Sequence, residues 1–316
     1  MTCIIPIGGN KGGTGKSFIG GNLCVALARS GKKTLMVDLD LGASNLHTII
    51  GMPLSSKCIS DFVNRRVDSL EETVISTPVP GLFLISGGLN DLDAANISYQ
   101  QKQRLVRSIS QLSYDYIILD LGAGTSFNTV DFLLISNTGI FITIPEPTAI
   151  ENFYRLIRSL FYRMMKHYAG ASDFKTIVGV AREHNSEGHA DSLDSLVVVF
   201  NDLFSEKAFF FEKALENVSF KLVMNQMRDS DNPKLGNLIC QVIEKHQGIP
   251  VGFLGNIAYN SRVHDSVCSR DLFIDKYSYT QTTLDIRKLS EAIIVMDKGA
   301  CEAVTKGGSS DKISRT

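Results

Sequence analysis

A glycine-rich loop near the start of the chain constrains the fold more than any other feature. The loop, residues 8–17, reads GGNKGGTGKS and lies between an apolar run, Cys3–Ile7, and a helix-like segment. Residues 10–17 fit the pattern G-x-x-x-x-G-K-[ST], except that Asn10 replaces the first glycine. In a strand–loop–helix setting, glycines let consecutive backbone N–H groups point at a polyphosphate, and the helix N-terminus adds its positive dipole end. The sequence therefore predicts a nucleoside-triphosphate site; a glycine-rich loop without a nucleotide is the alternative.

The residue types of this loop match separate tasks in binding a nucleotide. The predicted nucleotide-binding residues are Gly12, Gly13, Thr14, Gly15, Lys16 and Ser17. The Lys16 ammonium is placed to neutralise β- and γ-phosphate oxygens, and the Ser17 hydroxyl is placed to hold Mg²⁺. ATP and Mg²⁺ are therefore the expected cofactors.

The loop also carries a second lysine, Lys11, which an ordinary phosphate loop does not need. The spacing Lys11-Gly-Gly-Thr-Gly-Lys16-Ser17 resembles the deviant Walker A motif of the MinD/ParA family of dimeric ATPases. In that family the first lysine reaches across a dimer interface to the nucleotide held by the partner subunit. The resemblance implies a homodimer in the ATP-bound state, with Lys11 and Lys16 both catalytic. A merely solvated Lys11 is the alternative, because a loop lysine carries a long flexible ammonium.

Two carboxylates follow the next predicted strand, Lys33–Val37. The strand–helix–strand order predicts a right-handed βαβ unit with its ligand at the carboxyl ends of the strands, where Asp38 and Asp40 lie. The pattern D-x-D followed by Asn45 resembles switch I of the same family. By that resemblance Asp40 positions or activates the attacking water, Asp38 supports the metal or its waters, and Asn45 lies close to the nucleotide. Turn or cap formation by aspartate and asparagine is the alternative.

Tyr116–Asp120 is the clearest buried strand, an apolar run ended by an acid. Asp120 there fits a Walker B aspartate directed toward Mg²⁺ and its waters. The continuation to Gly124 resembles the family's switch II, in which Gly124 offers a backbone N–H to the γ-phosphate. Gly122 stands where the family more often has proline, and this form is nearer to its flagellar-number regulators, FlhG and FleN.

The predicted strand Phe220–Met224 ends in Asn225, which resembles the family's adenine-reading asparagine. A side-chain amide both accepts from an exocyclic amine and donates to a ring nitrogen. Asparagine also ends strands for turn reasons, which is the alternative. Ala258 replaces the proline that is common in the loop flanking the base, so adenine packing stays open.

Two parts of the chain fall outside the resemblance. We interpret residues 1–297 as one P-loop ATPase domain with a helical insertion at residues 170–218. Apolar residues from Leu193 to Leu215 recur at helical spacing and predict one amphipathic helix of about six turns, which either packs on the domain or forms a partner-binding surface. The polar tail, residues 298–316, is predicted to be disordered. It does not contain the amphipathic helix with which MinD lies on the membrane, so the tail does not support membrane contact.

Two further predicted helices, residues 98–112 and 149–168, carry clusters of basic side chains. The residues are Lys102, Arg104 and Arg107 in the first, and Arg155, Arg158, Arg163 and Lys166 in the second. Because acids are plentiful and the chain as a whole is not basic, we interpret both clusters as solvated surface, and a basic stripe along the second helix is the alternative.

The composition narrows the class of protein. With a formal charge of −1, the 316-residue chain has no overall attraction to nucleic acid or anionic lipid, so DNA contact stays open. Six cysteines are scattered singly without a C-x-x-C pair, which predicts free thiols in a reducing compartment and argues against an iron–sulfur carrier. No apolar run reaches the roughly 18 residues of a membrane-spanning helix, and the chain begins almost directly with a strand. We therefore expect a cytoplasmic protein.

These features predict one α/β domain, a doubly wound, mainly parallel sheet of about seven or eight strands with helices on both faces. The resemblance implies a slow, switch-type ATPase that dimerises with ATP, binds an unidentified protein partner and organises the position or number of a cell structure: flagella, the division site or DNA. A metabolic ATP-dependent amidase or ligase of the same fold is the alternative.

Overall fold

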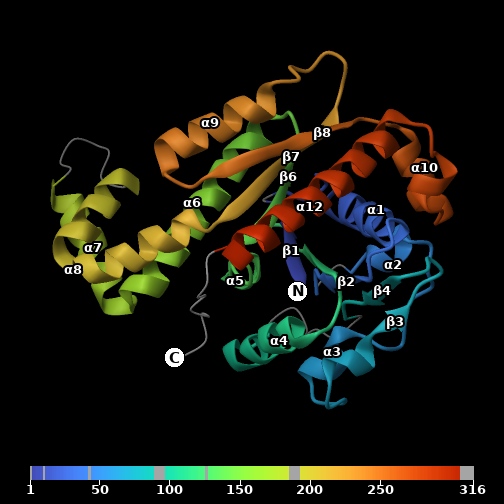
Figure 1. Cartoon of the computed structure of the whole chain (residues 1–316), viewed down its shortest axis with the longest axis horizontal. Coiled ribbons are helices and arrows are strands. Elements are labelled where there is room, and N and C mark those ends of the chain that lie inside the picture. The colour runs from blue at the N-terminus through green and yellow to red at the C-terminus, as the bar shows by residue number, and fades with distance from the viewer. Residues whose placement is uncertain are drawn as a thin grey trace.

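An eight-stranded sheet runs through the centre of the computed structural model, which describes residues 2–9, 11–41, 44–88, 97–124, 127–184 and 193–306 (Figure 1). The strand order is β3-β4-β2-β5-β1-β6-β7-β8, and only the β3–β4 pair is antiparallel. The strands are β1 (Cys3–Gly8), β2 (Thr34–Leu39), β3 (Ile75–Ser76), β4 (Leu82–Ile85), β5 (Tyr116–Leu121), β6 (Thr138–Thr143), β7 (Ser219–Met227) and β8 (Val251–Ala258). This confirms the predicted doubly wound sheet.

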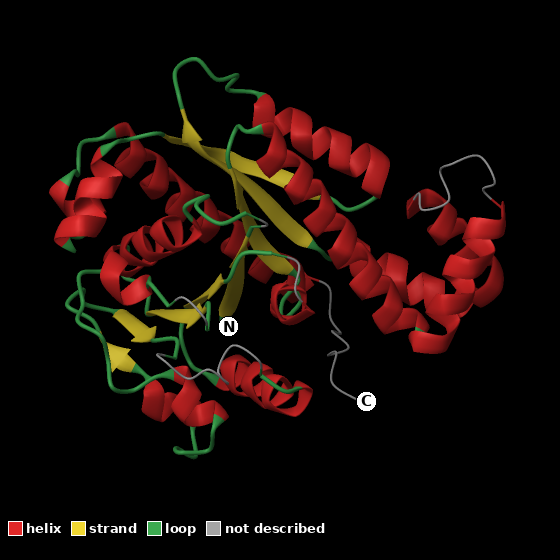
Figure 2. Cartoon of the chain, turned by 180° about the vertical axis from the view of Figure 1, so that it is seen from behind, coloured by secondary structure: helices red, strands yellow, loops and turns green. Residues whose placement is uncertain are grey.

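Helices cover both faces of this sheet (Figure 2). They are α1 (Lys16–Arg29), α2 (Leu46–Ile49), α3 (Ile59–Val63), the 3₁₀ turn η1 (Leu70–Thr73), α4 (Tyr99–Gln111), α5 (Phe127–Leu133), α6 (Pro147–Ala169), α7 (Ala171–His184), α8 (Leu193–Glu216), α9 (Leu235–Gln247), α10 (Arg262–Ser269), α11 (Phe273–Lys276) and α12 (Gln281–Lys306). Residues of α1, α2, α11 and α12 form one core, and residues of α3 to α9 form the other.

Strand β5 contributes side chains to both cores. Tyr116 and Ile118 belong to the core with α1, whereas Ile117 and Leu119 belong to the core on the opposite face. Successive side chains of a strand point to opposite faces, so a strand buried on both faces must be apolar throughout. This is why the central strands stand out in the sequence as continuous apolar runs.

Two predicted boundaries differ from the structure. Residues Asp68–Ile75 have a helix-like sequence and predict a short helix, but the structure has only the short turn η1 there, followed by the edge strand β3. The sequence also predicts a last helix over Thr283–Met296, whereas α12 continues to Lys306, so residues 298–306 of the predicted tail are helical. Residues 307–316 lie outside the described part of the chain, and the prediction of disorder stays untested there.

The predicted insertion forms a helical arm, defined here as α7 and α8, that projects beyond the sheet beside the end of α6 (left in Figure 1). The prediction of one continuous helix from Leu193 to Leu215 is wrong in one respect. At Phe204 the backbone leaves helical geometry, with φ −143° and ψ 54°, and α8 bends into two segments. Helix α7 was not predicted, and residues 185–192 lie outside the described residues.

Aromatic packing explains the bend in α8. Phe200 and Phe211 would lie about 16 Å apart along a straight helix, yet their ring centroids are 5.7 Å apart. Phe211 also packs edge-on against Phe161 of α6 at 5.2 Å. The Asn201 amide donates to Glu212 Oε1 at 2.9 Å across the bend. Folding α8 back on itself therefore buries both phenylalanines in one core.

A buried ionic cluster links three helices and corrects the interpretation of the basic side chains. Lys102 of α4, whose side chain is only 7% exposed, pairs with Asp131 of α5. Arg163 of α6 donates from Nε to the other oxygen of Asp131 at 2.6 Å. Arg104 donates to the backbone carbonyls of Phe62 and Asp68 at 3.1 and 3.3 Å. Lys102, Arg104 and Arg163 are therefore structural residues.

The remaining basic side chains of these two helices vary in their surroundings. Arg158 donates to the Tyr162 hydroxyl within the same helix, at 3.0 Å from Nε. Arg107, Arg155 and Lys166 are exposed, as predicted. A continuous basic stripe along α6 is therefore interrupted at two of its four positions.

Candidate nucleotide-binding site

The predicted site residues meet at one edge of the sheet. They lie at or after the carboxyl ends of β2, β5, β1 and β7, which with β6 are neighbours in the sheet. Because these strands are parallel, their carboxyl ends share one edge, which is where open α/β sheets bind ligands.

The glycine-rich loop leads from β1 into the N-terminus of α1. Gly13 and Gly15 adopt φ of +79° and +86°, the left-handed region that favours glycine. Gly15 is the N-cap of α1, and no side-chain hydrogen bond caps the helix among the described residues. The first-turn N–H groups of α1 and its dipole are therefore directed at the loop, as an anion site requires.

Gly15→Ala is expected to weaken nucleotide binding at least tenfold, because an added Cβ would lie 2.4 Å from Asn225 Nδ2 and alanine is strained at this φ by about 1–2 kcal/mol. Titration of a fluorescent ATP analogue measures the effect. Gly179→Ala, on α7 and outside the loop, is the matched control, since a Cβ there meets no atom of the described residues within 4 Å. Equal affinity of the two variants would contradict the role of Gly15.

The end of β7 closes the loop from the other side. Buried Asn225 donates from Nδ2 to the carbonyl of Thr14 at 2.8 Å. Gln226, held at φ +56°, donates from Nε2 to the carbonyl of Gly13 at 3.0 Å. The structure thus brings the predicted adenine-reading residue to the phosphate loop. Gln226 was not predicted; its position directly after Asn225 was the available signal.

Asp120 provides the strongest indication of a cation site. It lies opposite Asp38 in the register of β5 and β2, and its side chain is buried. The Ser17 hydroxyl bonds its carboxylate, but Asp120 Oδ1 has no hydrogen-bond partner among the described residues. Burial, followed by the charge of Asp38, raises the pKa of Asp120 to about 7.

This arrangement fits Mg²⁺. A buried carboxylate oxygen without a donor, beside a serine hydroxyl, offers oxygen ligands to a hard cation. No group of three or more His, Cys, Asp and Glu side chains that could hold a metal occurs in the described ranges. Mg²⁺ commonly takes one or two carboxylates and completes its shell with water and substrate phosphates, so a sparse protein ligand set is suitable.

Asp38 organises the backbone that follows β2. Its Oδ2 accepts from the Ser44 hydroxyl at 2.7 Å and from the N–H groups of Asn45 and Leu46 at 3.0 and 3.2 Å. Its Oδ1 accepts from the N–H of Asp40 at 3.1 Å. Burial raises the pKa of Asp38, and these hydrogen bonds oppose the shift. In this structure Asp38 therefore acts as an anchor for the predicted switch I segment.

Asp40 and Gly124 connect the two predicted switch segments to the loop. A Cβ on Gly122 would lie 3.1 Å from Asp40 Oδ1, so glycine at this position leaves room for the carboxylate. The Gly124 N–H, predicted to face the γ-phosphate, donates here to the carbonyl of Gly9 at 3.3 Å. Gly124 has φ +111°, which favours glycine. Asp40 thus lies against the predicted switch II segment, and that segment contacts the phosphate loop through Gly124.

The two loop lysines lie in different surroundings. Lys16 is buried, and its burial lowers the pKa of its ammonium, opposed by the charges of Asp120 and Asp40. The Lys11 side chain is 38% exposed, and its Nζ lies 2.5 Å from Glu146 Oε2, just before α6. Its Nζ also lies 3.5 Å from the Thr148 hydroxyl. Glu146 was not predicted as a site residue; its place after the central strand β6 was the signal.

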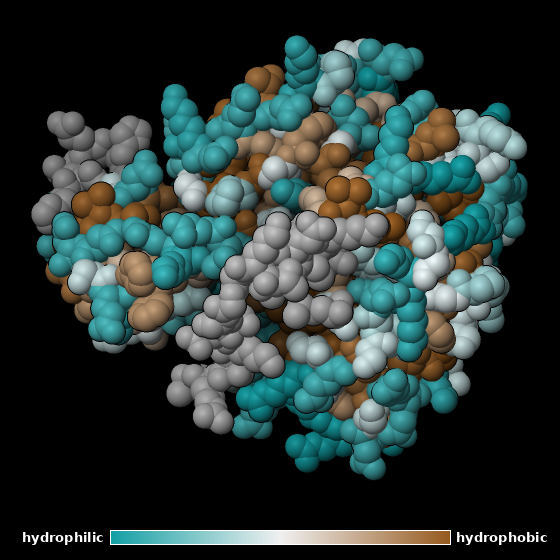
Figure 3. All heavy atoms as spheres, viewed as in Figure 1, coloured by the Kyte–Doolittle hydropathy of each residue, from teal (hydrophilic) through white to brown (hydrophobic). Residues whose placement is uncertain are grey.

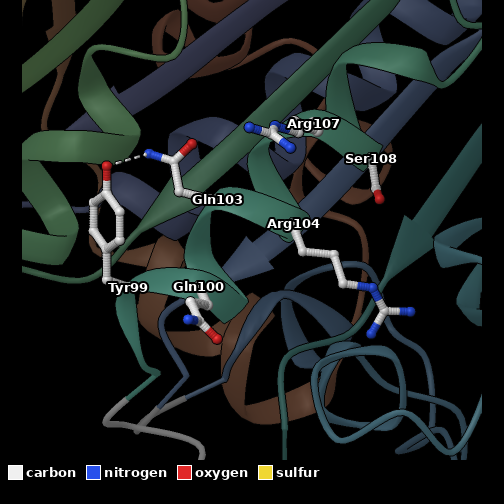
Figure 4. Close-up of a pocket in the computed structure, with 6 residues that line it drawn as sticks. All are labelled: Tyr99, Gln100, Gln103, Arg104, Arg107 and Ser108. Atoms are coloured by element: carbon white, nitrogen blue, oxygen red, sulfur yellow. Dashed lines mark hydrogen bonds between the residues drawn. The ribbon is translucent and has the colours of Figure 1, made fainter. Parts of the chain in front are cut away.

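A shallow pocket of about 400 Å³ lies elsewhere, along α4 (Figure 4). Its lining residues are Tyr99, Gln100, Gln103, Arg104, Arg107 and Ser108. Gln103 donates to the Tyr99 hydroxyl at 3.1 Å within the pocket. All the lining residues belong to one helix and none is a predicted site residue, so this pocket does not enter the functional argument.

The sheet topology and the loop define a P-loop nucleoside-triphosphatase fold with a second lysine in its phosphate loop. Residues 2–167 match a protein-family model described as an AAA domain. The chain belongs to the MinD/ParA family of P-loop ATPases.

Curated relatives match about half of the chain. The antiactivator FleN of Pseudomonas aeruginosa is 27% identical over 159 residues, covering 50% of this chain and 56% of that protein. The flagellum site-determining protein YlxH of Helicobacter pylori is 33% identical over 159 residues, covering 50% and 53%. The matches thus span little more than half the length of these curated relatives.

A solved structure shows that the likeness of fold extends further. The septum site-determining protein MinD of Pyrococcus horikoshii, complexed with Mg-ADP, has a TM-score of 0.66 and covers 98% of this chain and 100% of its own. At 18% identity this similarity establishes the fold alone.

Across the described ranges, no helix has the length and apolar character needed to cross a membrane.

Proposed function

We propose that this chain is an ATP-hydrolysing, nucleotide-dependent dimerisation switch that organises the position or number of a cell structure. The observation that carries the proposal is the separation of the two loop lysines. Lys16 is buried beside Asp120 and Asp40, where it serves the chain's own phosphate site, whereas Lys11 lies at the surface on Glu146. A loop lysine directed away from its own site is suited to a nucleotide held by a second copy. The relatives named for flagellar and septum placement support the cellular role.

The residues of the site divide the work of ATP hydrolysis among them. Backbone N–H groups of the loop and the Lys16 ammonium bind the phosphates, and Ser17 and Asp120 hold Mg²⁺. Mg²⁺ supplies charge neutralisation on the phosphate oxygens. Asp40, against the Gly122 backbone, orients the water that attacks the γ-phosphate, giving ADP and phosphate. Catalysis of such reactions depends mostly on positioning of the reacting groups. Turnover is therefore expected to be slow, because the set of catalytic residues is complete only when the dimer has formed.

Release of the γ-phosphate is expected to act through the segment after β5. The Gly124 N–H binds the Gly9 carbonyl in this structure, and α5 begins shortly afterwards at Phe127. Asp131 of α5 holds Lys102 of α4 and Arg163 of α6. A shift of the Gly124 N–H between the γ-phosphate and Gly9 is therefore transmitted to three helices, which would present different surfaces to a protein partner.

The Asp40→Ala protein is expected to be a dimer with ATP and a monomer with ADP, because it binds ATP and no longer activates the water. Size-exclusion chromatography with light scattering measures the mass. In the Asp40→Ala background, Lys11→Ala is expected to leave the protein monomeric with ATP, whereas Glu146→Gln, which removes only the intramolecular ion pair, retains the dimer.

Two outcomes would contradict the proposal. An Asp40→Ala protein that binds ATP yet stays monomeric would exclude the dimerisation switch. ATP turnover that requires added ammonia or a carboxylate would favour the amidase or ligase class instead.

A further inference from the structure

Two successive side-chain amides at the end of β7 hold two successive carbonyls of the phosphate loop. Asn225 Nδ2 lies 2.8 Å from the carbonyl oxygen of Thr14, and Gln226 Nε2 lies 3.0 Å from that of Gly13. The paired residues are 211 and 213 positions apart in the chain. The interpretation of Asn225 as an adenine reader leaves Gln226 without a task, although both amides bond the loop in the same way.

The backbone at Gln226 explains how both amides reach one loop. Successive side chains of a regular strand point to opposite faces of the sheet, so two adjacent residues do not normally contact the same segment. Gln226 has φ +56°, and the register of β7 with β8 shifts between Met224 and Met227. Irregularities of this kind re-aim a side chain. The departure from strand geometry therefore turns the Gln226 amide toward the loop that Asn225 also contacts.

This backbone conformation is unfavourable for glutamine. Glycine adopts a positive φ without strain but would supply no amide. The residues that follow, 228–234, are mostly polar and form the loop at the top of Figure 1, where teal hydrophilic atoms gather in the space-filling view (Figure 3). Because Gln226 is only half-buried beside this polar loop, water is available to its amide, and strain is not needed to satisfy it. A strained residue without a local need for strain points to a functional constraint.

Each held carbonyl fixes the direction of one loop N–H. The C=O and N–H of a planar trans peptide point in opposite directions, and the described residues contain no cis peptide bond. The Gly13 carbonyl shares its peptide with the N–H of Thr14, and the Thr14 carbonyl shares its peptide with the N–H of Gly15. In the described part of the chain, neither N–H donates a hydrogen bond to the protein. The two amides therefore orient two donors that are available to a ligand.

The loop has little packing of its own to hold these peptides. A Cβ added at Gly12 or Gly13 would meet no atom of the described residues within 4 Å. Glycine also has the greatest backbone freedom of any residue. The amides at the end of β7, a strand inside the sheet, are therefore fixed supports for an open and glycine-rich segment.

We propose that Gln226 is a positioning residue for polyphosphate. Its amide holds the Gly13 peptide so that the Thr14 N–H is directed at a phosphate oxygen of the bound nucleotide, as successive N–H groups are in anion-binding loops. The proposal rests on the nucleotide-binding part of the proposed function and does not depend on dimerisation.

The held atoms separate this role from recognition of the base. Gln226 acts on binding through the Thr14 N–H, so its effect passes through the phosphates and is the same whether or not a base is present. Inorganic triphosphate carries a phosphate chain without base or ribose. With Mg²⁺ present, it is the probe that isolates the role of Gln226.

Gln226→Met is expected to weaken binding of a fluorescent ATP analogue and of competing inorganic triphosphate by the same factor, about fivefold, the scale of one ordinary hydrogen bond. Methionine has a similar length and no donor. Gln103→Met is the matched control, because it removes an amide that donates to the Tyr99 hydroxyl at 3.1 Å on α4. This control is expected to bind both probes like the unmodified protein.

Gln226→Gly separates the amide from the backbone conformation. It is expected to lose affinity by the same factor of about five, while the Tm of the nucleotide-free protein stays within about 3 °C, because relief of strain offsets the lost hydrogen bond. A merely structural role would lower Tm and affinity together. Arg65→Gly, at another non-glycine residue of positive φ (+58°), is the matched control and is expected to bind both probes normally.

Four results would overturn the proposal. They are unchanged affinity in Gln226→Met, a loss confined to the ATP analogue, no competition by inorganic triphosphate even with the unmodified protein, and full affinity in Gln226→Gly. The second would assign the amide to the base or ribose, and the last would show that only the backbone matters. Each leaves the dimerisation switch intact, because the mass of the Asp40→Ala protein is measured separately. Failure of the unmodified protein to bind the ATP analogue would overturn the proposed function together with this role of Gln226.

Discussion

Lys16→Met is expected to lower ATP turnover by about a thousandfold or more, the scale set by removing a preorganised charge from a water-excluded site. The Lys16 ammonium is buried, and the charges of Asp120 and Asp40 favour its protonated form. Its Nζ lies 3.5 Å from the Lys11 carbonyl. Methionine has similar length and no charge, so the phosphate oxygens lose their positive partner. Phosphate release measures turnover, and a fluorescent ATP analogue measures binding.

The matched control for this change is Lys221→Met. Lys221 is a half-buried lysine of β7, near the start of that strand and so at the opposite edge of the sheet from the loop. Its replacement removes an ammonium group far from the loop and is expected to leave turnover within about twofold, since substitutions away from functional features have small effects. Turnover of Lys16→Met within tenfold of the unmodified protein would exclude Lys16 as the phosphate-neutralising group.

Asp120→Asn is expected to raise the thermal stability of the nucleotide-free, metal-free protein at pH 8 and to change it little near pH 4. The pKa of Asp120 is about 7 in the folded protein and about 3.9 in an unfolded chain. Between these values the folded state binds the extra proton, so stability falls as pH rises through the window. The full effect is about 4 kcal/mol, from roughly 1.4 kcal/mol for each pKa unit.

Differential scanning calorimetry across this pH range measures the difference in Tm between Asp120→Asn and the unmodified protein. The difference is expected to grow as pH rises from 4 to 7, and the stabilisation by Mg²⁺ and ATP together is expected to be lost in the variant. Asp229→Asn, at an exposed position, is the control for a general loss of negative charge. A Tm difference that does not vary with pH would show that Asp120 is ionised throughout the window.

The parts of the fold that sequence predicts well are those set by local pattern. Tyr116–Leu121 is buried on both faces and reads as a strand from its apolar run alone. The positive φ angles at Gly13 and Gly15 favour glycine, so the loop can be recognised in the sequence as a motif. Asp120 can be predicted as a site residue too, because it ends an apolar strand and parallel strands have their carboxyl ends at the same edge of the sheet.

Contacts between distant segments were the parts that could not be predicted. Nothing local distinguishes Lys102, buried against Asp131, from exposed Arg107 on the same helix. The bend at Phe204 arises from packing of Phe200 and Phe211 in one core, which a helical period cannot show. The ion pair of Lys11 with Glu146 joins residues 135 positions apart, and only the fold brings them together.

Helix α6 has a mechanical consequence for the whole molecule. It is a single helix of 23 residues, about 34 Å long, that begins next to Glu146, is held in its second half by the Arg163–Asp131 pair and ends at the arm. A rod supported between its ends is a lever. In the dimer proposed above, Lys11 would leave Glu146 for the second nucleotide site, so the contact at the start of α6 would be lost while the Arg163–Asp131 pair is kept. Under that proposal, a tilt of α6 about Asp131 would move the arm relative to the sheet, which would couple the position of the arm to the state of Lys11.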